Sequence, residues 1–396
     1  MLKNKRIVLG VTGSIAAYKA IELTRRLTEA GAIVDVIMTE AATRFIAPLS
    51  FGSVTAGNVF TDLFNDPLSH IKVTEGASAM VIAPATANIV GKMANGIADD
   101  MLTTAYMAFK GKVIIVPSMN WRMYENPATK KNLEILQSYG VIQLGPEKGA
   151  LACGESNTGR MAEVEDIIEE IFRSLSKKDF LGKRVVITAG PTREYIDPIR
   201  FISNRSSGKM GYALARIASR RGAEVILISG PSNLKPPKGV SIVSVETTSE
   251  MRDAVMSNIK DSDILIMAAA VADFSSEDKS EVKIDSRDGL ILKLQRTPDI
   301  IKEVTSLDKR LFVVAFSAET GKNLDRARQK LIEKNADIIV FNDVTESGAG
   351  FDVDTNKITI IDRERRESFP LMTKEEAAQL ILDRITKGLK GGIRQD

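Results

Sequence analysis

Residues 5–14, KRIVLGVTGS, combine two basic residues, a short apolar run and a glycine turn. A segment of helical periodicity follows and ends near Glu29, and Ile33–Met38 is apolar again. Strand, glycine-rich turn, helix and strand in this order open a parallel α/β unit. The pattern starts a second time at residues 183–187, KRVVI, before a helical stretch at about 209–221. The sequence therefore predicts two α/β domains.

Further short apolar runs predict the remaining strands. They lie at 79–83 and 113–116 in the first half and at 225–228, 264–270, 311–316 and 338–341 in the second. Strands without polar alternation are typical of a parallel sheet covered by helices on both faces, so we expect a Rossmann-type sheet in each half. In the second half, apolar stretches at 282–284 and 290–294 flank Asp288-Gly289, which predicts an antiparallel hairpin.

A change in composition marks the boundary between the halves. A helix predicted over 162–175 is followed by the charged stretch 176–179, SKKD. Charged residues without apolar periodicity are typical of a solvent-exposed connection. We place the linker at about 174–182 and expect one domain at 1–176 and a second at 177–396.

The composition is that of a globular protein: the 396 residues are 44% hydrophobic and carry a net charge of +3. This small excess of positive charge gives no reason to expect a nucleic-acid or membrane partner. One cysteine, Cys153, and one histidine, His70, exclude a disulfide framework and zinc sites of several Cys and His. No apolar stretch approaches the ~20 residues of a membrane-spanning helix, and we expect a cytoplasmic protein.

Three loops in the first half predict a ligand pocket. The glycine turn at 10–14 offers backbone N–H groups at a helix start, which suits a phosphate, although such turns are also often purely structural. It is neither a P-loop nor a complete GxGxxG fingerprint. Small and hydroxyl residues at 83–88 and 117–120 follow two more predicted strands. Ligands of parallel sheets bind at that edge.

Each of the two single residues has an ordinary and a functional interpretation. A lone histidine such as His70 is most often a surface or hydrogen-bonded residue. A lone cysteine is most often a small buried hydrophobe. Cys153, however, lies within residues 149–160, where glycines and polar side chains predict a surface flap that could cover a ligand and exclude water.

Together these segments resemble the flavin-containing cysteine decarboxylases. The resemblance is carried by residues 13–19, 84–88, 117–120 with 126–127, and 152–154 with 159–161. Over nearly its full length the chain resembles the bifunctional family in which phosphopantothenoylcysteine decarboxylase is fused to phosphopantothenate–cysteine ligase.

The resemblance implies a flavodoxin-like (Rossmann-type) first domain that binds FMN. Oxidation of the substrate thiol through FMN would create the electron sink needed for loss of CO2. The resemblance makes His70 the acid/base residue, lets Asn120 hold the substrate carboxylate, and lets Cys153 protonate the enethiol product. It implies FMN contacts at Gly13, Ser14, Ile15, Thr39, Pro84, Ala85, Thr86, Asn88 and Ser118, and substrate contacts at Met119, Ala152 and Arg160. Ser118 stands where Ala is more usual.

In the second half, residues 200–211 gather cations and serines around a glycine at a helix start. Such a cluster suits a polyphosphate, while a solvated basic loop is the alternative. Asp273 follows a predicted buried strand, where it could hold a metal or simply cap a helix. Lys283 falls on the predicted hairpin, where edge protection is its ordinary role.

This half resembles the ligase domain, most specifically at 204–211, NRSSGKMG. The resemblance implies that CTP and Mg2+ (or Mn2+) convert 4′-phosphopantothenate into an acyl cytidylate, which the amine of cysteine attacks. It gives Asn204 and Lys283 catalytic roles and Asp273 the metal. Nucleotide or substrate contacts are implied for Gly190, Arg200, Arg205, Ser206, Ser207, Gly208, Lys209, Asp273, Lys283, Arg296, Phe316 and Asn342. Arg296 stands where Lys is expected, so its role is open.

The resemblance also implies a homo-oligomer, with a trimer-based decarboxylase core and dimeric ligase domains. Two alternatives are a flavin-dependent peptidyl-cysteine decarboxylase or prenyltransferase, and a non-catalytic regulatory subunit on the same fold. The signature at 204–211 argues against the first. The joint presence of His70, Asn120 and Cys153 argues against the second.

Overall fold

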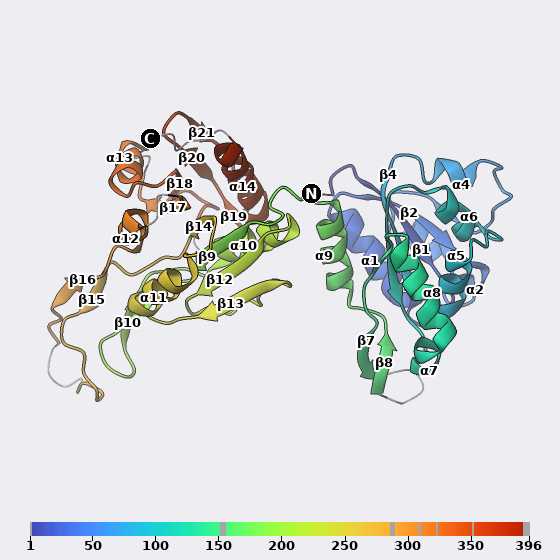
Figure 1. Ribbon diagram of the computed structural model, residues 1–396, viewed down its shortest axis with the longest axis horizontal. Helices are drawn as coiled ribbons and strands as arrows, with labels where there is room; N and C mark the ends of the chain where they lie inside the picture. The colour runs from blue at the N-terminus through green and yellow to red at the C-terminus, as the bar shows by residue number, and fades with distance from the viewer. Residues whose placement is uncertain are drawn as a thin grey trace. The chain divides into compact units, whose positions relative to one another are not determined.

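The computed structural model describes residues 2–150, 156–285, 290–307, 310–321, 324–350 and 352–390. The chain divides into two compact units, Met1–Ser176 and Lys177–Asp396. Each unit is an α/β structure (Figure 1). The expected fold class is confirmed in both halves.

In the described part of unit 1, six parallel strands form a sheet of order β3-β2-β1-β4-β5-β6. The strands are β1 Arg6–Val11, β2 Ile33–Met38, β3 Val59–Phe60, β4 Ala77–Ala85, β5 Lys112–Pro117 and β6 Ile142–Gln143, with a separate hairpin of β7 Glu147–Ala150 and β8 Ser156–Arg160. The helices are α1 Ala17–Glu29, α2 Glu40–Thr43, α3 Pro48–Gly52, α4 Ser69–Lys72, α5 Ala87–Ala94, α6 Met101–Ala108, α7 Trp121–Glu125, α8 Pro127–Ser138 and α9 Val164–Leu175.

Both faces of this sheet are covered, which explains the uninterrupted apolar strands. In β1, Ile7 and Leu9 pack with α1 and α9 on one face, while Val8 packs with α5, α6 and α8 on the other (Figure 1). Since β1 and β4 are neighbours at the centre, the strand order reverses between them. A crevice for ligands forms outside the carboxyl ends of strands at such a reversal.

The described part of unit 2 repeats this order in an eight-stranded sheet, β13-β12-β9-β14-β17-β18-β20-β21, in which β20 and β21 run antiparallel. Its strands are β9 Arg184–Ala189, β12 Glu224–Ser229, β13 Val240–Ser244, β14 Ile264–Met267, β17 Phe312–Glu319, β18 Ile338–Asp343, β20 Ile358–Ile361 and β21 Arg366–Ser368. Short pairs are β10 Arg193–Tyr195 with β11 Phe201–Ser203, β15 Phe274–Ser276 with β16 Leu294–Arg296, and β19 Thr355–Asn356 with β22 Met372–Thr373.

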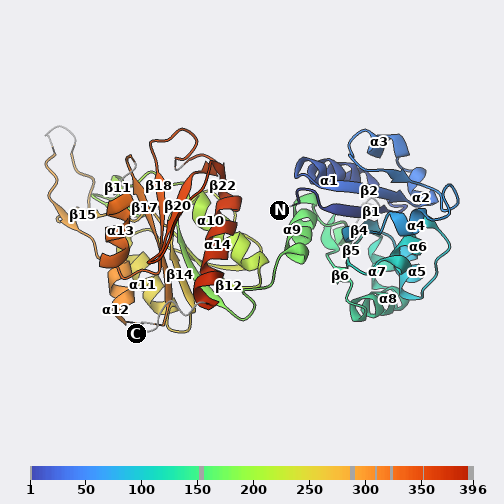
Figure 2. The same ribbon diagram turned by 90° about the horizontal axis from the view of Figure 1, so that it is seen from above.

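Helices again form a layer on each face of the sheet. They are α10 Lys209–Arg220, α11 Thr248–Asn258, α12 Ile300–Leu307, α13 Leu324–Glu333 and α14 Lys374–Lys390. The core on one face includes α10 and α14, and the core on the other includes α11, α12 and α13 (Figure 2). The strand order reverses between β9 and β14, so a second crevice is expected there.

The hairpin predicted from Asp288-Gly289 is displaced. Residues 282–284 belong to no strand, and the antiparallel pairing joins β15 to β16 instead. Pairing occurs where the backbone is anchored at the sheet edge, since the N–H of Thr297 donates to Asp273 O at 3.1 Å. Asp288 and Gly289 themselves lie outside the described residues.

Unit 2 holds the chain within a few residues of the end of α9. Lys178 Nζ donates to Arg220 O at 2.7 Å, and Asp179 pairs with the buried Arg221 at 2.6 Å. Phe180 is fully buried beneath the Arg221 guanidinium. The connection between the two units is therefore short.

Candidate active sites

In unit 1, the loops that follow β1, β4 and β5 meet at the strand reversal. Thr12 Oγ1 donates to Pro84 O at 2.7 Å, and the Ser14 and Ser118 hydroxyl oxygens are 3.1 Å apart. The N–H of Ser118 donates to Ala85 O at 2.9 Å. Three segments far apart in the sequence thus place hydroxyl groups at one edge of the sheet.

The same edge carries three helix starts. Thr39 caps α2 and Thr86 caps α5 through their side-chain oxygens, while α1 begins without a side-chain cap or an acid in its first turn. Ile15, beside that start, is exposed, and Asn88 lies exposed on α5. Hydroxyls together with uncapped N–H groups are donors that suit a phosphate monoester such as that of FMN, so this set fits the implied cofactor.

Asn120 is positioned by its own helix and by the hairpin. Its Oδ1 accepts from the N–H of Arg122 at 2.9 Å, which caps α7. Next to it, the N–H of Met119 donates to Gly159 O at 3.0 Å. A Cβ on Gly159 would lie 2.2 Å from Met119 O, so only glycine permits this close approach. Strand β8 is thereby fixed to the loop that carries Asn120.

The other residues implied for the decarboxylase are Ala152, Cys153, Arg160 and His70. Arg160, at the end of β8, forms an ion pair with Glu163. Ala152 and Cys153 lie outside the described residues. His70 lies on α4, which packs against α6 through a contact of Ser69 with Met101, rather than on the hydroxyl loops. Its Nδ1 is buried without a hydrogen-bond partner, a state that suits a group reserved for proton transfer.

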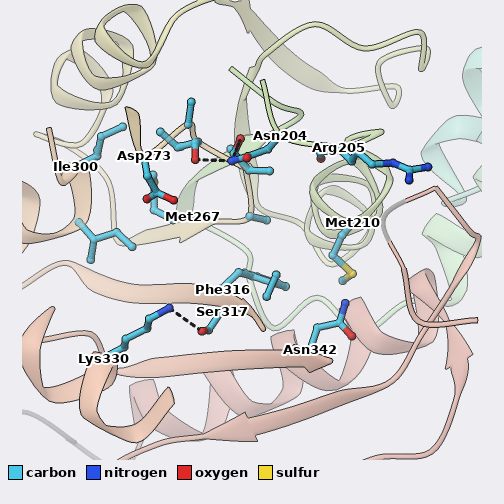
Figure 3. A pocket seen from close by; sticks show the side chains of 18 of the residues that line it. Asn204, Arg205, Met210, Met267, Asp273, Ile300, Phe316, Ser317, Lys330 and Asn342 are labelled. Atoms are coloured by element: carbon cyan, nitrogen blue, oxygen red, sulfur yellow. Dashed lines mark hydrogen bonds between the residues drawn. The ribbon is translucent and has the colours of Figure 1, made fainter. Parts of the chain in front are cut away.

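Unit 2 contains a cavity of about 750 Å³ at its own strand reversal. Its walls come from the segment between β11 and α10, from the loop after β14, from the ends of β16, β17 and β18, and from α12 and α13 (Figure 3). The predicted site residues that line it are Asn204, Arg205, Ser206, Gly208, Lys209, Asp273, Arg296, Phe316 and Asn342. One cavity therefore collects most of the predicted ligase residues.

One wall of this cavity is built around the start of α10. Gly208 caps the helix with a left-handed backbone, φ +78°, and a Cβ there would lie 3.3 Å from the Gly190 nitrogen. Lys209 follows at the first helical position and pairs with Asp354 at 2.7 Å, while Arg205 pairs with Asp352 at 3.2 Å. Both carboxylates are largely exposed, so a ligand phosphate can replace them.

Asn204 and Asp273 face the cavity near each other, with Phe316 below them (Figure 3). Asn204 Nδ2 donates to Val271 O at 2.9 Å, which leaves its amide oxygen at the cavity. Asn342 Nδ2 donates to Ala349 O at 2.9 Å, and its Oδ1 is buried without a partner. These amides offer polar contacts to a bound substrate.

Four further cations, which were not predicted from the sequence, also line the cavity. Arg326, Lys330 and Lys334 follow each other at intervals of four residues along α13 and its end, and such spacing places them on one helix face. The fourth, Lys374, is only 7% exposed, and burial together with the charge of Lys209 lowers its pKa to about 8. The four-residue spacing was the only available signal, and it is equally typical of a solvated helix face.

Four predicted residues do not line the cavity. Gly190 supports the wall from behind, because its carbonyl accepts from the N–H of Ala270 at 2.9 Å. Arg200 contacts Asp197 at 3.3 Å, and the Ser207 carbonyl accepts from Ser232 Oγ at 3.0 Å. Lys283 is exposed.

Asp273 is the one predicted metal ligand. No group of three or more His, Cys, Asp or Glu that could hold a metal is found among the described residues. Mg2+ commonly keeps several waters and binds through one or two carboxylates together with substrate phosphates. Asp273 at the wall of a cation-lined cavity fits such a site.

Among the described residues, none of the helices combines the length and the apolar character that a membrane span requires.

Each half of the chain matches a known protein family. Residues 1–176 match the flavoprotein family, and residues 180–389 match the C-terminal domain of DNA/pantothenate metabolism flavoproteins. The coenzyme A biosynthesis bifunctional proteins CoaBC of Bacillus subtilis and Escherichia coli K12 are 47% and 43% identical, over 97% of each chain. The crystal structure of a CoaBC C-terminal domain is 40% identical, with TM-score 0.48, over 54% of this chain and 100% of that one. The chain therefore belongs to the family of bifunctional coenzyme A biosynthesis proteins, which join a flavoprotein decarboxylase domain to a ligase domain.

Proposed function

We propose that unit 2 couples 4′-phosphopantothenate to cysteine at the expense of CTP, and that unit 1 decarboxylates the product to 4′-phosphopantetheine. The observation that carries the proposal is the cavity of unit 2, where cations of α10, α13 and α14 surround Asn204 and Asp273. A carboxylate becomes electrophilic only after its oxygen is made a good leaving group, and a nucleoside triphosphate provides that activation.

In the ligase half, the substrate carboxylate oxygen attacks the α-phosphorus of CTP and pyrophosphate leaves. The amine of cysteine then attacks the acyl carbon, and CMP leaves as the amide forms. Lys209, Lys330 and Lys334 bind phosphate oxygens, and Asp273 binds Mg2+. Asn204 contacts the acyl cytidylate through its amide oxygen. Lys283 does not line the cavity, so it has no role in this scheme.

In the decarboxylase half, bound FMN would take two electrons from the substrate thiol, which makes loss of CO2 feasible, and would return them to the decarboxylated substrate. Ser14, Thr86 and Ser118 would hold the FMN phosphate together with the N–H groups at the uncapped start of α1, whose dipole favours negative charge. Asn120 holds the substrate carboxylate, while His70 transfers a proton. Cys153 returns a proton to the decarboxylated substrate.

A mass-resolved assay tests both halves together. Purified protein is incubated with 4′-phosphopantothenate, cysteine, Mg2+ and either CTP or ATP. Phosphopantetheine and CO2 formed with CTP would support both activities and the nucleotide. Accumulation of phosphopantothenoylcysteine would argue against the decarboxylase half, and no consumption of 4′-phosphopantothenate would argue against the ligase half. A visible flavin spectrum separates this function from that of a regulatory subunit, for which FMN is optional.

We further propose a cytoplasmic homo-oligomer with a trimer-based decarboxylase core and paired ligase domains. This assembly is the one that the resemblance of the sequence to the bifunctional family implies. Some large apolar side chains are exposed in each unit and are candidates for its contacts. They include Ile15, Tyr18, Leu49 and Phe64 in unit 1 and Phe201, Phe274 and Ile291 in unit 2. Sedimentation analysis that found a monomer at micromolar concentration would contradict this assignment.

A further inference from the structure

Lys330 is held at the cavity wall by a carboxylate behind it. Glu319, the last residue of β17, forms an ion pair with Lys330 Nζ. The Ser317 hydroxyl donates to the same carboxylate at 3.0 Å. It accepts from Lys330 Nζ at 3.3 Å (Figure 3). The ammonium, the hydroxyl and the carboxylate therefore close a triangle. Of the three residues, Lys330 and Ser317 line the cavity and Glu319 does not.

Glu319 is well suited to hold a charge in one place. Its side chain is 10% exposed, and its backbone lies in the ladder between β17 and β18. Burial acts to raise the pKa of Glu319, but hydrogen bonds from Lys330 and Ser317 outweigh it and lower that pKa below its usual value. The carboxylate is therefore ionised at neutral pH and keeps its lysine partner.

The cations across the cavity are held differently. The partners of Arg205 and Lys209 are Asp352 and Asp354, which are 61% and 87% exposed. Water screens such pairs, and a ligand phosphate can take the place of either carboxylate. Glu319 is too buried to be displaced in this way, so its pairing with Lys330 persists when a ligand binds. A lysine side chain that is already ordered loses less conformational entropy on binding.

We propose that Glu319 is a positioning residue for the nucleotide. Through Ser317 and Lys330 it fixes one ammonium at the place where the polyphosphate of a nucleoside triphosphate binds. This inference rests on the proposed nucleotide site. Charge alone predicts the opposite effect, because removal of a carboxylate near an anion site should strengthen anion binding. The sign of the change therefore separates positioning from simple electrostatics.

The test is Glu319→Gln in the full-length protein. We expect the dissociation constant of CTP–Mg2+, measured by calorimetry, and the CTP KM of the ligase reaction to rise roughly tenfold. The KM for 4′-phosphopantothenate, the ligase kcat and the decarboxylase rate should stay unchanged. Glu303→Gln is the matched control, because it removes the partner of Arg252, a cation that does not line the cavity. CTP binding by Glu319→Gln that is unchanged or tighter would overturn the proposal.

A double-mutant cycle separates this proposal from the nucleotide site on which it rests. Lys330→Met should weaken CTP binding, and adding Glu319→Gln to that variant should produce little further loss. An equal loss in both backgrounds would show that Glu319 does not act through Lys330 and would overturn the positioning role alone. Normal CTP binding by Lys330→Met would remove Lys330 from the nucleotide site and overturn the positioning role, whereas no CTP binding by the unmodified protein would overturn the nucleotide site itself.

Discussion

The six parallel strands of each sheet follow the same order, but the two units present different chemical groups where that order reverses. Strand order reverses between β1 and β4 in unit 1 and between β9 and β14 in unit 2. At the first reversal the groups are the hydroxyls of Ser14 and Ser118, and at the second they are cations such as Lys209. The backbone order thus determines where a ligand binds, and the side chains determine which charge it carries.

This difference agrees with the two proposed ligands. A phosphate monoester is satisfied by hydroxyls and the N–H groups of a helix start. A triphosphate carries more charge and needs lysines or a metal ion as well. The same comparison explains why the small net charge of +3 did not reveal the basic cavity: acids distributed over the surface balance the cations that line it.

The largest expected effect is confined to unit 1. In Gly159→Val, the new Cβ would lie 2.2 Å from Met119 O and displace the loop that carries Asn120. We expect the decarboxylase rate to fall roughly 100-fold or more, while the ligase rate stays unchanged. In the control Gly52→Ala, the new Cβ would meet nothing within 4 Å. Equal loss of both activities in Gly159→Val would point to general misfolding.

In unit 2, Lys209→Met should raise the nucleotide KM roughly 10- to 100-fold, because a charged hydrogen bond to phosphate is lost. The decarboxylase rate of the same sample serves as the internal standard. Lys357→Met is a suitable control, since Lys357 pairs with Glu346 and does not line the cavity. A nucleotide KM as in the unmodified protein would remove Lys209 from the site.

Ionic strength should distinguish the two sites without any mutation. Raising the salt concentration from about 0.05 to about 0.5 M shortens the Debye length and weakens the electrostatic attraction between exposed cations and an anionic ligand. We expect the nucleotide KM to rise roughly severalfold, while FMN retention, followed by its visible absorbance after filtration, changes little. Similar salt sensitivity at both sites would contradict the proposed contrast.

The smallest effect concerns pH. The Lys374 ammonium, with a pKa of about 8, loses its proton as pH rises through that value, and the cavity becomes less positive. We expect the nucleotide KM to rise roughly threefold between pH 7.5 and 9, and this dependence should be absent in Lys374→Met. The same loss of a proton weakens nucleotide binding but should increase folding stability. The unfolded chain keeps this proton up to about 10.5, so raising the pH above 8 favours the folded form.

Sequence patterns predicted the two sheets and the family correctly. Apolar strands such as β1 and β9 are buried on both faces, and this leaves an uninterrupted apolar run that can be recognised without knowledge of the partner strands. The signature at 204–211 was equally visible, because a phosphate site at a helix start is built from consecutive residues. The role of each site residue remains a prediction.

Other features could be decided only by the tertiary structure. Local pattern placed the hairpin at Asp288-Gly289, whereas anchoring at the sheet edge placed the pairing between β15 and β16. Lys330 resembles any surface lysine in the sequence, and only the packing of α13 beside β17 brings it to Glu319 and the cavity. The sequence alone determined what depends on neighbours along the chain: periodicity, turns and helix starts. Contacts between distant segments, which define the cavity, required the folded chain.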